Sequence, residues 1–159
     1  MSTSRSSSSL VKTALDCVPR EQIAIDAGRL LENAFDYLTL LYGVRMARKP
    51  EPFYTLGELN SAVRSIKNWQ IAYDGQTTEI KPLLDALQPL IPVRNEAGAH
   101  YNESGELLSD EDITAFGLAA LTLPKALICR DCNSLAQKQD NVGHWKCQCG
   151  HTTMQPYKI

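Results

Sequence analysis

The sequence predicts a mainly α fold, an up-down helical bundle followed by a small β segment near the C-terminus. Two observations lead to this prediction. Apolar residues recur at three- and four-residue steps through much of the first 127 positions, with no alternating strand pattern before residue 128. Four of the five cysteines then fall within the last 31 residues. The chain therefore divides into a helical body and a cysteine-rich end.

The first predicted helix begins near Pro19, because proline is tolerated in a first helical turn. Pro50 and Pro52 end any continuation of it. Its length of roughly six to eight turns suits an amphipathic helix with one buried side. The apolar stripe consists of Ile23, Ala27, Leu30, Leu31, Ala34, Leu38 and Leu41.

Three further helices are marked by their start signals. Thr55 and Glu58 form a capping-box pattern, and Ser109 precedes three acidic residues that favour a helix N-terminus. Between these two starts, Asp74-Gly75 predicts a turn, and a helix is expected to begin at Thr77 or Thr78. Pro89 and Pro92 make the end of that helix irregular.

Composition limits the function classes. Lys and Arg number 16 against 18 Asp and Glu, so the formal net charge is −2. A general electrostatic nucleic-acid binder is usually clearly basic, which argues against that class but leaves room for a local basic patch. The serine-rich N-terminus lacks an apolar signal region, and no run of 18 apolar residues suggests a membrane span. The expected location is cytoplasmic, with no membrane partner.

The clustered cysteines predict a metal site. Cys129 and Cys132 are separated by two residues, and Cys147 and Cys149 follow after a further 14. Zinc prefers four ligands in a tetrahedron, and structural sites favour thiolates. Glycines at positions 143 and 150 give the intervening chain the freedom to turn. The arrangement resembles a zinc ribbon over residues 128–159, with Zn2+ in a structural role because four thiolates leave no position for water.

The ligand set has alternatives. The second pair is Cys-x-Cys and not the commoner Cys-x-x-Cys, so His151 is able to replace either Cys147 or Cys149, and His144 is a weaker substitute. The other alternative is that the cysteines are free thiols in a reducing cytoplasm. Cys17 stands apart and is expected to be a small buried hydrophobic residue.

Arg94 and His100 are the candidates for catalysis. A histidine exchanges a proton near neutral pH, and an arginine holds a phosphate through two hydrogen bonds. Together they could cleave RNA without a metal: a base activates the ribose 2′-OH, an acid protonates the leaving oxygen, and Arg94 stabilises the charge that develops on phosphorus. The alternative is structural, with Arg94 paired to Glu96 or Glu103 and His100 capping a helix end.

Arg94, Asn95 and His100 together resemble the Arg-(four to six residues)-His motif of HEPN-domain proteins. The resemblance implies an all-α, commonly dimeric fold and metal-independent ribonuclease activity, as in toxin, phage-defence and CRISPR systems. Tyr101 directly follows the histidine, whereas the toxin branch has a tyrosine two residues after it. Six helical steps turn by about 240°, so the two side chains meet only if the segment is distorted or two protomers share the site.

These observations give three predicted regions: a disordered Ser-rich tail over 1–9, a helical HEPN-like domain over 10–127, and a zinc ribbon over 128–159. The first functional hypothesis is an endoribonuclease-like effector of a prokaryotic toxin or phage-defence system, acting on RNA as a homodimer. The second is a non-catalytic accessory subunit of a larger ATPase–nuclease (SMC-like) defence complex, docking through the ribbon and the loop at Phe53-Tyr54. A DNA-binding regulator is the third hypothesis. RNA-binding residues are not identifiable from the sequence.

Overall fold

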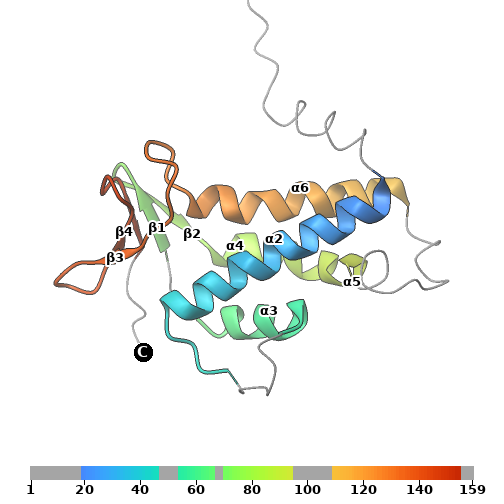
Figure 1. Ribbon diagram of the computed structural model, residues 1–159, viewed down its shortest axis with the longest axis horizontal. Helices are drawn as coiled ribbons and strands as arrows, with labels where there is room; N and C mark the ends of the chain where they lie inside the picture. Colours follow the sequence, from blue (N-terminus) through green and yellow to red (C-terminus); the bar gives the residue numbers. More distant parts are fainter. Residues whose placement is uncertain (1–18, 47–53, 67–69, 95–108, 155–159) are drawn as a thin grey trace, which may run out of the picture.

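The computed structural model describes residues 19–46, 54–66, 70–94 and 109–154. Two long helices, α2 (Arg20–Leu41) and α6 (Asp110–Leu127), pack against each other. Shorter helices lie beside them: α3 (Leu56–Arg64), α4 (Lys81–Leu87) and α5 (Ile91–Arg94), with the 3-10 turn η1 (Gln88–Leu90) joining the last two. A sheet of five short strands lies at one end of the helices (Figure 1).

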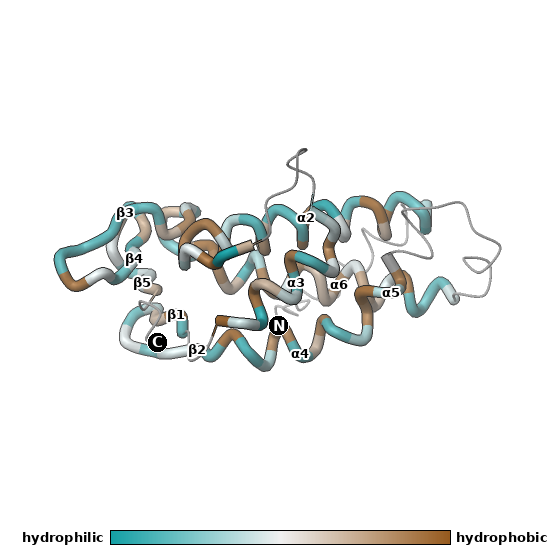
Figure 2. The backbone as a smooth tube through the Cα atoms, turned by 90° about the horizontal axis from the view of Figure 1, so that it is seen from below, coloured by the Kyte–Doolittle hydropathy of each residue, from teal (hydrophilic) through white to brown (hydrophobic). Residues whose placement is uncertain are grey.

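The sheet combines strands from distant parts of the chain. Its order is β2-β1-β5-β4-β3 and every pairing is antiparallel. The hairpin β1 (Gln70–Tyr73) and β2 (Gln76–Glu79) comes from the middle of the chain, whereas β3 (Lys138–Gln139), β4 (Trp145–Lys146) and β5 (Thr152–Met154) follow α6. Figure 2 shows the two groups of strands together beyond the helix ends. The sheet thus spans both sides of the boundary expected at residue 127.

The predicted fold class, a mainly α up-down helical bundle with a small β ribbon, is wrong, because the fold is mixed α/β. The helix expected from Thr77 or Thr78 is instead strand β2, and helix α4 begins at Lys81. The turn at Asp74-Gly75 is confirmed, and its φ angles of 47° and 76° are both left-handed. Two consecutive left-handed residues make the tight turn that joins antiparallel strands, so the chain forms a hairpin there.

Helix direction also departs from an up-down bundle. α2 and α6 run the same way along the molecule, as the colours in Figure 1 show. Their N-terminal ends are bridged by Arg20 and Asp110, whose side chains lie 3.5 Å apart. Sequential helices of an up-down bundle place the first and fourth antiparallel. The first and the last helix that the structure describes are therefore parallel, unlike those of an up-down bundle.

The helix starts expected at Thr55 and Ser109 are confirmed. Thr55 accepts a hydrogen bond from the backbone N–H of Glu58, whose carboxylate accepts one from Thr55 N–H at 2.8 Å. Ser109 and Asp112 form the same reciprocal cap on α6. The irregularity expected near Pro89 and Pro92 is present. Pro89 lies in the 3-10 turn η1, which separates α4 from α5, and Pro92 lies in α5.

One apolar core joins the helices to the sheet. Ile71 of β1, Met154 of β5 and Ala136 are buried in the same cluster as the helical residues. The largest fully buried helical side chains are Phe35, Phe116, Leu31, Leu38, Leu56, Leu87, Ile113, Leu123, Leu127 and Val63. The C-terminal strands are therefore part of the molecule's main core.

Tyr37 is a polar link between α2 and the C-terminal segment. Its hydroxyl donates a hydrogen bond of 2.7 Å to the carbonyl of Ala136 and lies 3.8 Å from the sulfur of Met154. Burial raises the pKa of Tyr37 to about 12, against a smaller opposing effect of the hydrogen bond with Ala136. The hydroxyl therefore stays protonated and remains a donor across the ordinary pH range.

We expect Tyr37→Phe to lower the free energy of unfolding by about 1–2 kcal/mol, because the Ala136 carbonyl loses its side-chain donor at a part-buried position. Chemical denaturation followed by circular dichroism measures the change. Tyr54→Phe removes the same atom outside this junction and should change the free energy by less than about 0.5 kcal/mol. If both variants lose the same free energy of unfolding, the hydroxyl of Tyr37 does not stabilise the junction.

Candidate metal centre

The first pair of cysteines lies in a tight turn directly after α6. The helix ends at Leu127, and Ile128 is extended with φ −87° and ψ 128°. The N–H of Cys129 donates to the carbonyl of Ser134, and the N–H of Asn133 donates to the carbonyl of Cys129, both at 3.0 Å. We call residues 129–134 the first knuckle. Its hydrogen bonds hold Cys129 and Cys132 on one side of the turn.

The second pair lies between strands β4 and β5. The N–H of Gly150 donates to the carbonyl of Cys147 at 3.1 Å, and Gly150 has a φ of 83° that favours glycine. The backbone of Cys147 pairs with that of Thr152 at 3.0 Å. We call residues 147–152 the second knuckle. The antiparallel pairing of β4 with β5 fixes its two ends.

The two knuckles bring all four sulfurs together. Their Sγ atoms lie within 4.8 Å of one another. The Sγ of Cys149 is 3.6 Å from the Sγ of Cys129 and 3.6 Å from that of Cys147. Four sulfurs at about 2.3 Å from one tetrahedral ion lie about 3.8 Å apart. The donor set and its spacing therefore fit a single metal ion, as the cysteine pattern predicts.

The centre is closed on one side and open on the other. Cys129 and Cys147 are buried, Cys132 is half-buried and Cys149 is exposed. The buried pair would hold an ion against the protein, and Cys149 is the thiol that solvent reaches. A metal ion held here would therefore be shielded from most directions but accessible beside Cys149.

The thiols differ in their affinity for protons. The hydroxyl of Ser134, with backbone contacts, lowers the pKa of Cys132 to about 5. The pKa of Cys149 rises to about 12: the backbone N–H of His151 opposes this strongly, but desolvation and the three neighbouring cysteine thiols together outweigh it. Four thiolates at this spacing repel one another, so a bound cation is the natural means of keeping all four deprotonated.

Ser134 is a residue that sequence analysis missed. Its hydroxyl lies 3.0 Å from the Sγ of Cys132 and accepts a hydrogen bond of 3.2 Å from the N–H of Gln148. It therefore joins the first knuckle to the second. A further hydrogen bond of 3.2 Å runs from the N–H of Thr152 to the Sγ of Cys147. Groups that orient metal ligands in this way tune both geometry and affinity.

Neither of the two histidines considered as alternative ligands belongs to the group of four sulfurs. His151 Nδ1 is 2.6 Å from Asp131 Oδ2, on the exposed side of the knuckles. His144 Nδ1 is 3.5 Å from Asp140 Oδ2, in the turn between β3 and β4. The four cysteines form a complete set without either ring.

The predicted catalytic residues are not placed by the structure. Helix α5 is described as far as Arg94, but the side chain of Arg94 is not described. Asn95, His100 and Tyr101 lie outside the described residues, as do Cys17 and Phe53. The proposed meeting of Arg94 with His100 therefore stays a prediction.

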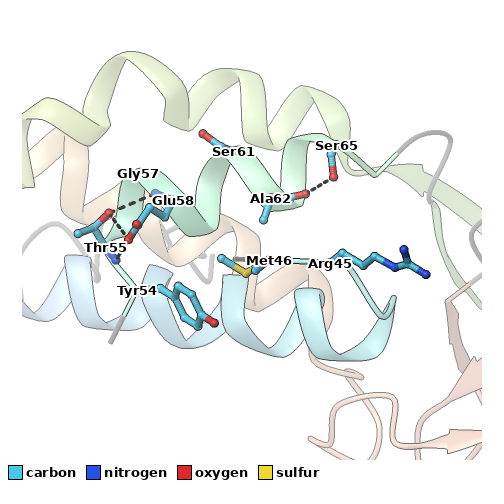
Figure 3. A pocket seen from close by; sticks show the side chains of 9 residues that line it. All are labelled: Arg45, Met46, Tyr54, Thr55, Gly57, Glu58, Ser61, Ala62 and Ser65. Atoms are coloured by element: carbon cyan, nitrogen blue, oxygen red, sulfur yellow. Dashed lines mark hydrogen bonds between the residues drawn. The ribbon is translucent and has the colours of Figure 1, made fainter. Parts of the chain in front are cut away.

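A shallow pocket of about 640 Å3 lies beside α3, away from the cysteines (Figure 3). Arg45, Met46 and Tyr54 line one side of it, and α3 lines the other. The carboxylate of Glu58 in this pocket is held by the backbone and hydroxyl of Thr55 at 2.8 and 3.0 Å. Because that carboxylate already caps the helix, the pocket is a weaker candidate for a ligand-binding site than the cysteine centre.

Comparison of the chain with protein-family models, curated proteins and solved structures finds no match. In the part of the chain that the structure describes, no helix combines the length and apolar character needed to cross a membrane.

Proposed function

We propose that the four-cysteine centre binds a zinc ion in a structural role. The observation that supports this proposal is the closed set of four sulfurs, because zinc is commonly held by four thiolates in structural sites. A saturated tetrahedron leaves no position for a water or a substrate. Zinc here would fasten the two knuckles, and with them strands β4 and β5, to the end of α6.

Metal analysis of the purified full chain tests this proposal. Elemental mass spectrometry is expected to find zinc retained through gel filtration in a buffer without chelator. Cys17→Ser should retain the same amount, whereas Cys147→Ser should lose it. Iron with visible absorption, or no metal in the parent chain, would contradict the assignment.

For the biological role we propose a non-catalytic accessory subunit that binds a larger ATPase–nuclease (SMC-like) defence complex. The closed metal centre supports a structural over a catalytic part for zinc. The near balance of 16 basic and 18 acidic residues suits a protein partner better than nucleic acid. The loop between β3 and β4 offers a contact point, since Val142 at its tip keeps 73% of its surface exposed.

That loop is held rigidly in shape. The carboxylate of Asp140 accepts hydrogen bonds of 2.9 Å from the backbone N–H groups of Val142 and His144. These bonds, with the one from His144 the strongest contributor, lower the pKa of Asp140 to about 2. A preformed loop that presents an apolar side chain loses little conformational entropy when it binds a partner.

Affinity purification of the full chain from its native cells tests the role. A large ATPase subunit is expected to co-purify with the parent chain, and Val142→Asp should reduce its recovery at least about 10-fold while zinc content stays unchanged. Leu40→Asp is the matched control, since Leu40 is also 73% exposed but lies on α2. If no ATPase subunit is recovered, or if both variants behave alike, this role is wrong.

A second candidate function is a metal-independent endoribonuclease, supported by the Arg94-Asn95-(four residues)-His100 sequence at the end of α5. His100 would transfer the proton between the ribose 2′-OH and the leaving oxygen, and Arg94 would stabilise the charge on phosphorus. Asn95 would orient the polar groups beside them. A homodimer would supply the pair from two chains.

If the chain is this ribonuclease, His100→Ala should slow RNA cleavage about 100- to 10,000-fold, because it removes the proton-transfer group. The measurement is cleavage of a labelled single-stranded RNA with and without chelator. His144→Ala removes a histidine outside the motif and should leave the rate unchanged. Cleavage by His100→Ala at the parent rate would exclude this mechanism.

A further inference from the structure

Three different metal-binding side chains meet on the exposed side of the four-cysteine centre. Asp131, Cys149 and His151 each offer one ligand atom, and these atoms lie within 4.8 Å of one another. Asp131 stands between the two cysteines of the first knuckle, and the other two residues belong to the second knuckle. The same folding that assembles the four sulfurs therefore assembles this second group, and Cys149 belongs to both.

Neighbouring groups hold this second set in place. The hydroxyl of Tyr73, at the end of β1, donates a hydrogen bond of 3.0 Å to Asp131 Oδ2. The same oxygen lies 2.6 Å from His151 Nδ1. The backbone N–H of Asp74 donates to the carbonyl of His151 at 3.3 Å. The contacts from Tyr73 and Asp74 come from outside the three ligands, and contacts of this kind orient the side chains that bind a metal.

Access and charge both favour a cation at this position. The side chains of Asp131 and His151 are 47% and 59% exposed, and Cys149 is exposed as well. Four thiolates around one divalent ion carry a net charge of −2, and Asp131 adds a further negative charge. The guanidinium of Arg130, which lies over the ring of Tyr73 at 5.1 Å from its centroid, offsets only one unit of this negative charge. A thiolate sulfur that already binds one metal ion still has lone pairs with which it can bind a second metal ion.

We propose that Asp131, His151 and Cys149 bind a second divalent transition-metal ion of the zinc class, with the Cys149 thiolate bridging the two ions. The proposal rests on the first ion being held by the four cysteines. His151 binds through Nδ1 as a neutral ring with its proton on Nε2, so a second proton, where the ring carries one on Nδ1, passes to solvent when the ion enters. Ligands at about 2.1 Å from a tetrahedral ion lie about 3.4 Å apart, and the exposed Asp131–His151 contact widens to that spacing.

Three protein donors leave the fourth position of this ion to water. The second ion should therefore bind more weakly than the first and exchange with solvent. Zinc, cobalt(II) and similar ions accept this mixture of sulfur, nitrogen and oxygen, whereas magnesium and calcium prefer oxygen alone. The second site would thus be selective for the same class of ions as the first.

Cobalt(II) titration of the full chain loaded with one zinc ion tests the proposal. One further ion should bind per chain, with a thiolate-to-cobalt absorption band and no release of zinc. His151→Gln and Asp131→Asn should each weaken this second binding at least about 10-fold and remove the band. His144→Gln is the matched control, because His144 also lies beside an aspartate, Asp140, but away from the sulfurs.

The outcomes separate the two sites. If the chain that already holds one zinc ion takes up no cobalt, the second site is overturned and the four-cysteine site stands. If the chain binds neither zinc nor cobalt, both sites are overturned. A band in His151→Gln equal to the parent's, or a loss in His144→Gln equal to that in His151→Gln, would also overturn the assignment. If one of the two site variants fails to fold by circular dichroism, the other decides.

Discussion

Removing the proposed zinc ion from the four-cysteine centre is expected to unfold the sheet end of the molecule while α2 and α6 remain helical. Strands β3 and β4 have two residues each, too few to persist without support. Without a cation, the thiols must either hold their protons or repel one another. We expect the free energy of unfolding of the sheet end to fall by about 4 kcal/mol or more, since structural zinc supplies much of the folding energy of such segments.

Hydrogen exchange measured by mass spectrometry follows this change by segment. Chelation, or the variant Cys129→Ser, should remove protection from peptides covering β4 and β5, and also from β1, which pairs with β5 through Ile71 and Met154. Peptides of α2 should keep theirs. Cys17→Ser is the control with the same substitution at a cysteine outside the cluster. Full protection of β5 after chelation would show that the metal does not hold the sheet.

The helices could be predicted because their signals are local. The apolar stripe of α2 follows directly from residue spacing, and both capping boxes are short patterns whose partners are three residues apart. Such contacts form within one or two turns of the chain. Their appearance in the structure therefore depends little on the rest of the fold.

The β1–β2 hairpin could not be recognised in the same way. All four residues of β2 are exposed, so the strand has no alternating apolar face for a pattern to reveal. Its neighbour β1 is buried mainly through Ile71, and the strand that covers its other edge, β5, comes about 80 residues later. Asp74-Gly75 is the available signal, since this dipeptide is typical of tight hairpins. It predicts the turn but not the strands on either side.

The candidate metal centre shows the same difference between residues that a local pattern reveals and residues that only folding brings together. The four cysteines are visible in the sequence because metal ligands have characteristic spacing. The groups around the cysteines are not visible in this way. Tyr73 and Asp131 are separated by 58 positions in the sequence, and Ser134 and Gln148 are separated by 14 positions. Only the folded chain brings these residues together. The polar surroundings that position metal ligands are thus a property of the tertiary structure.

The second large effect is expected in the helical core, where Phe116→Ala should lower the free energy of unfolding by about 3–5 kcal/mol. Phe116 lies on α6 and is fully buried, as is Phe35 on α2. Truncating a buried phenylalanine removes its apolar contacts and leaves a cavity that the neighbouring side chains fill only in part. Urea denaturation followed by helical circular dichroism measures the loss.

Leu40→Ala provides the contrast for this measurement, because Leu40 lies on α2 but keeps 73% of its surface exposed. It should change the free energy by no more than about 0.5 kcal/mol. The metal content of Phe116→Ala should stay at the parent value under native conditions, since the cysteines lie beyond the end of α6. A loss below about 1 kcal/mol for Phe116→Ala would mean that α6 does not pack on α2 through this face.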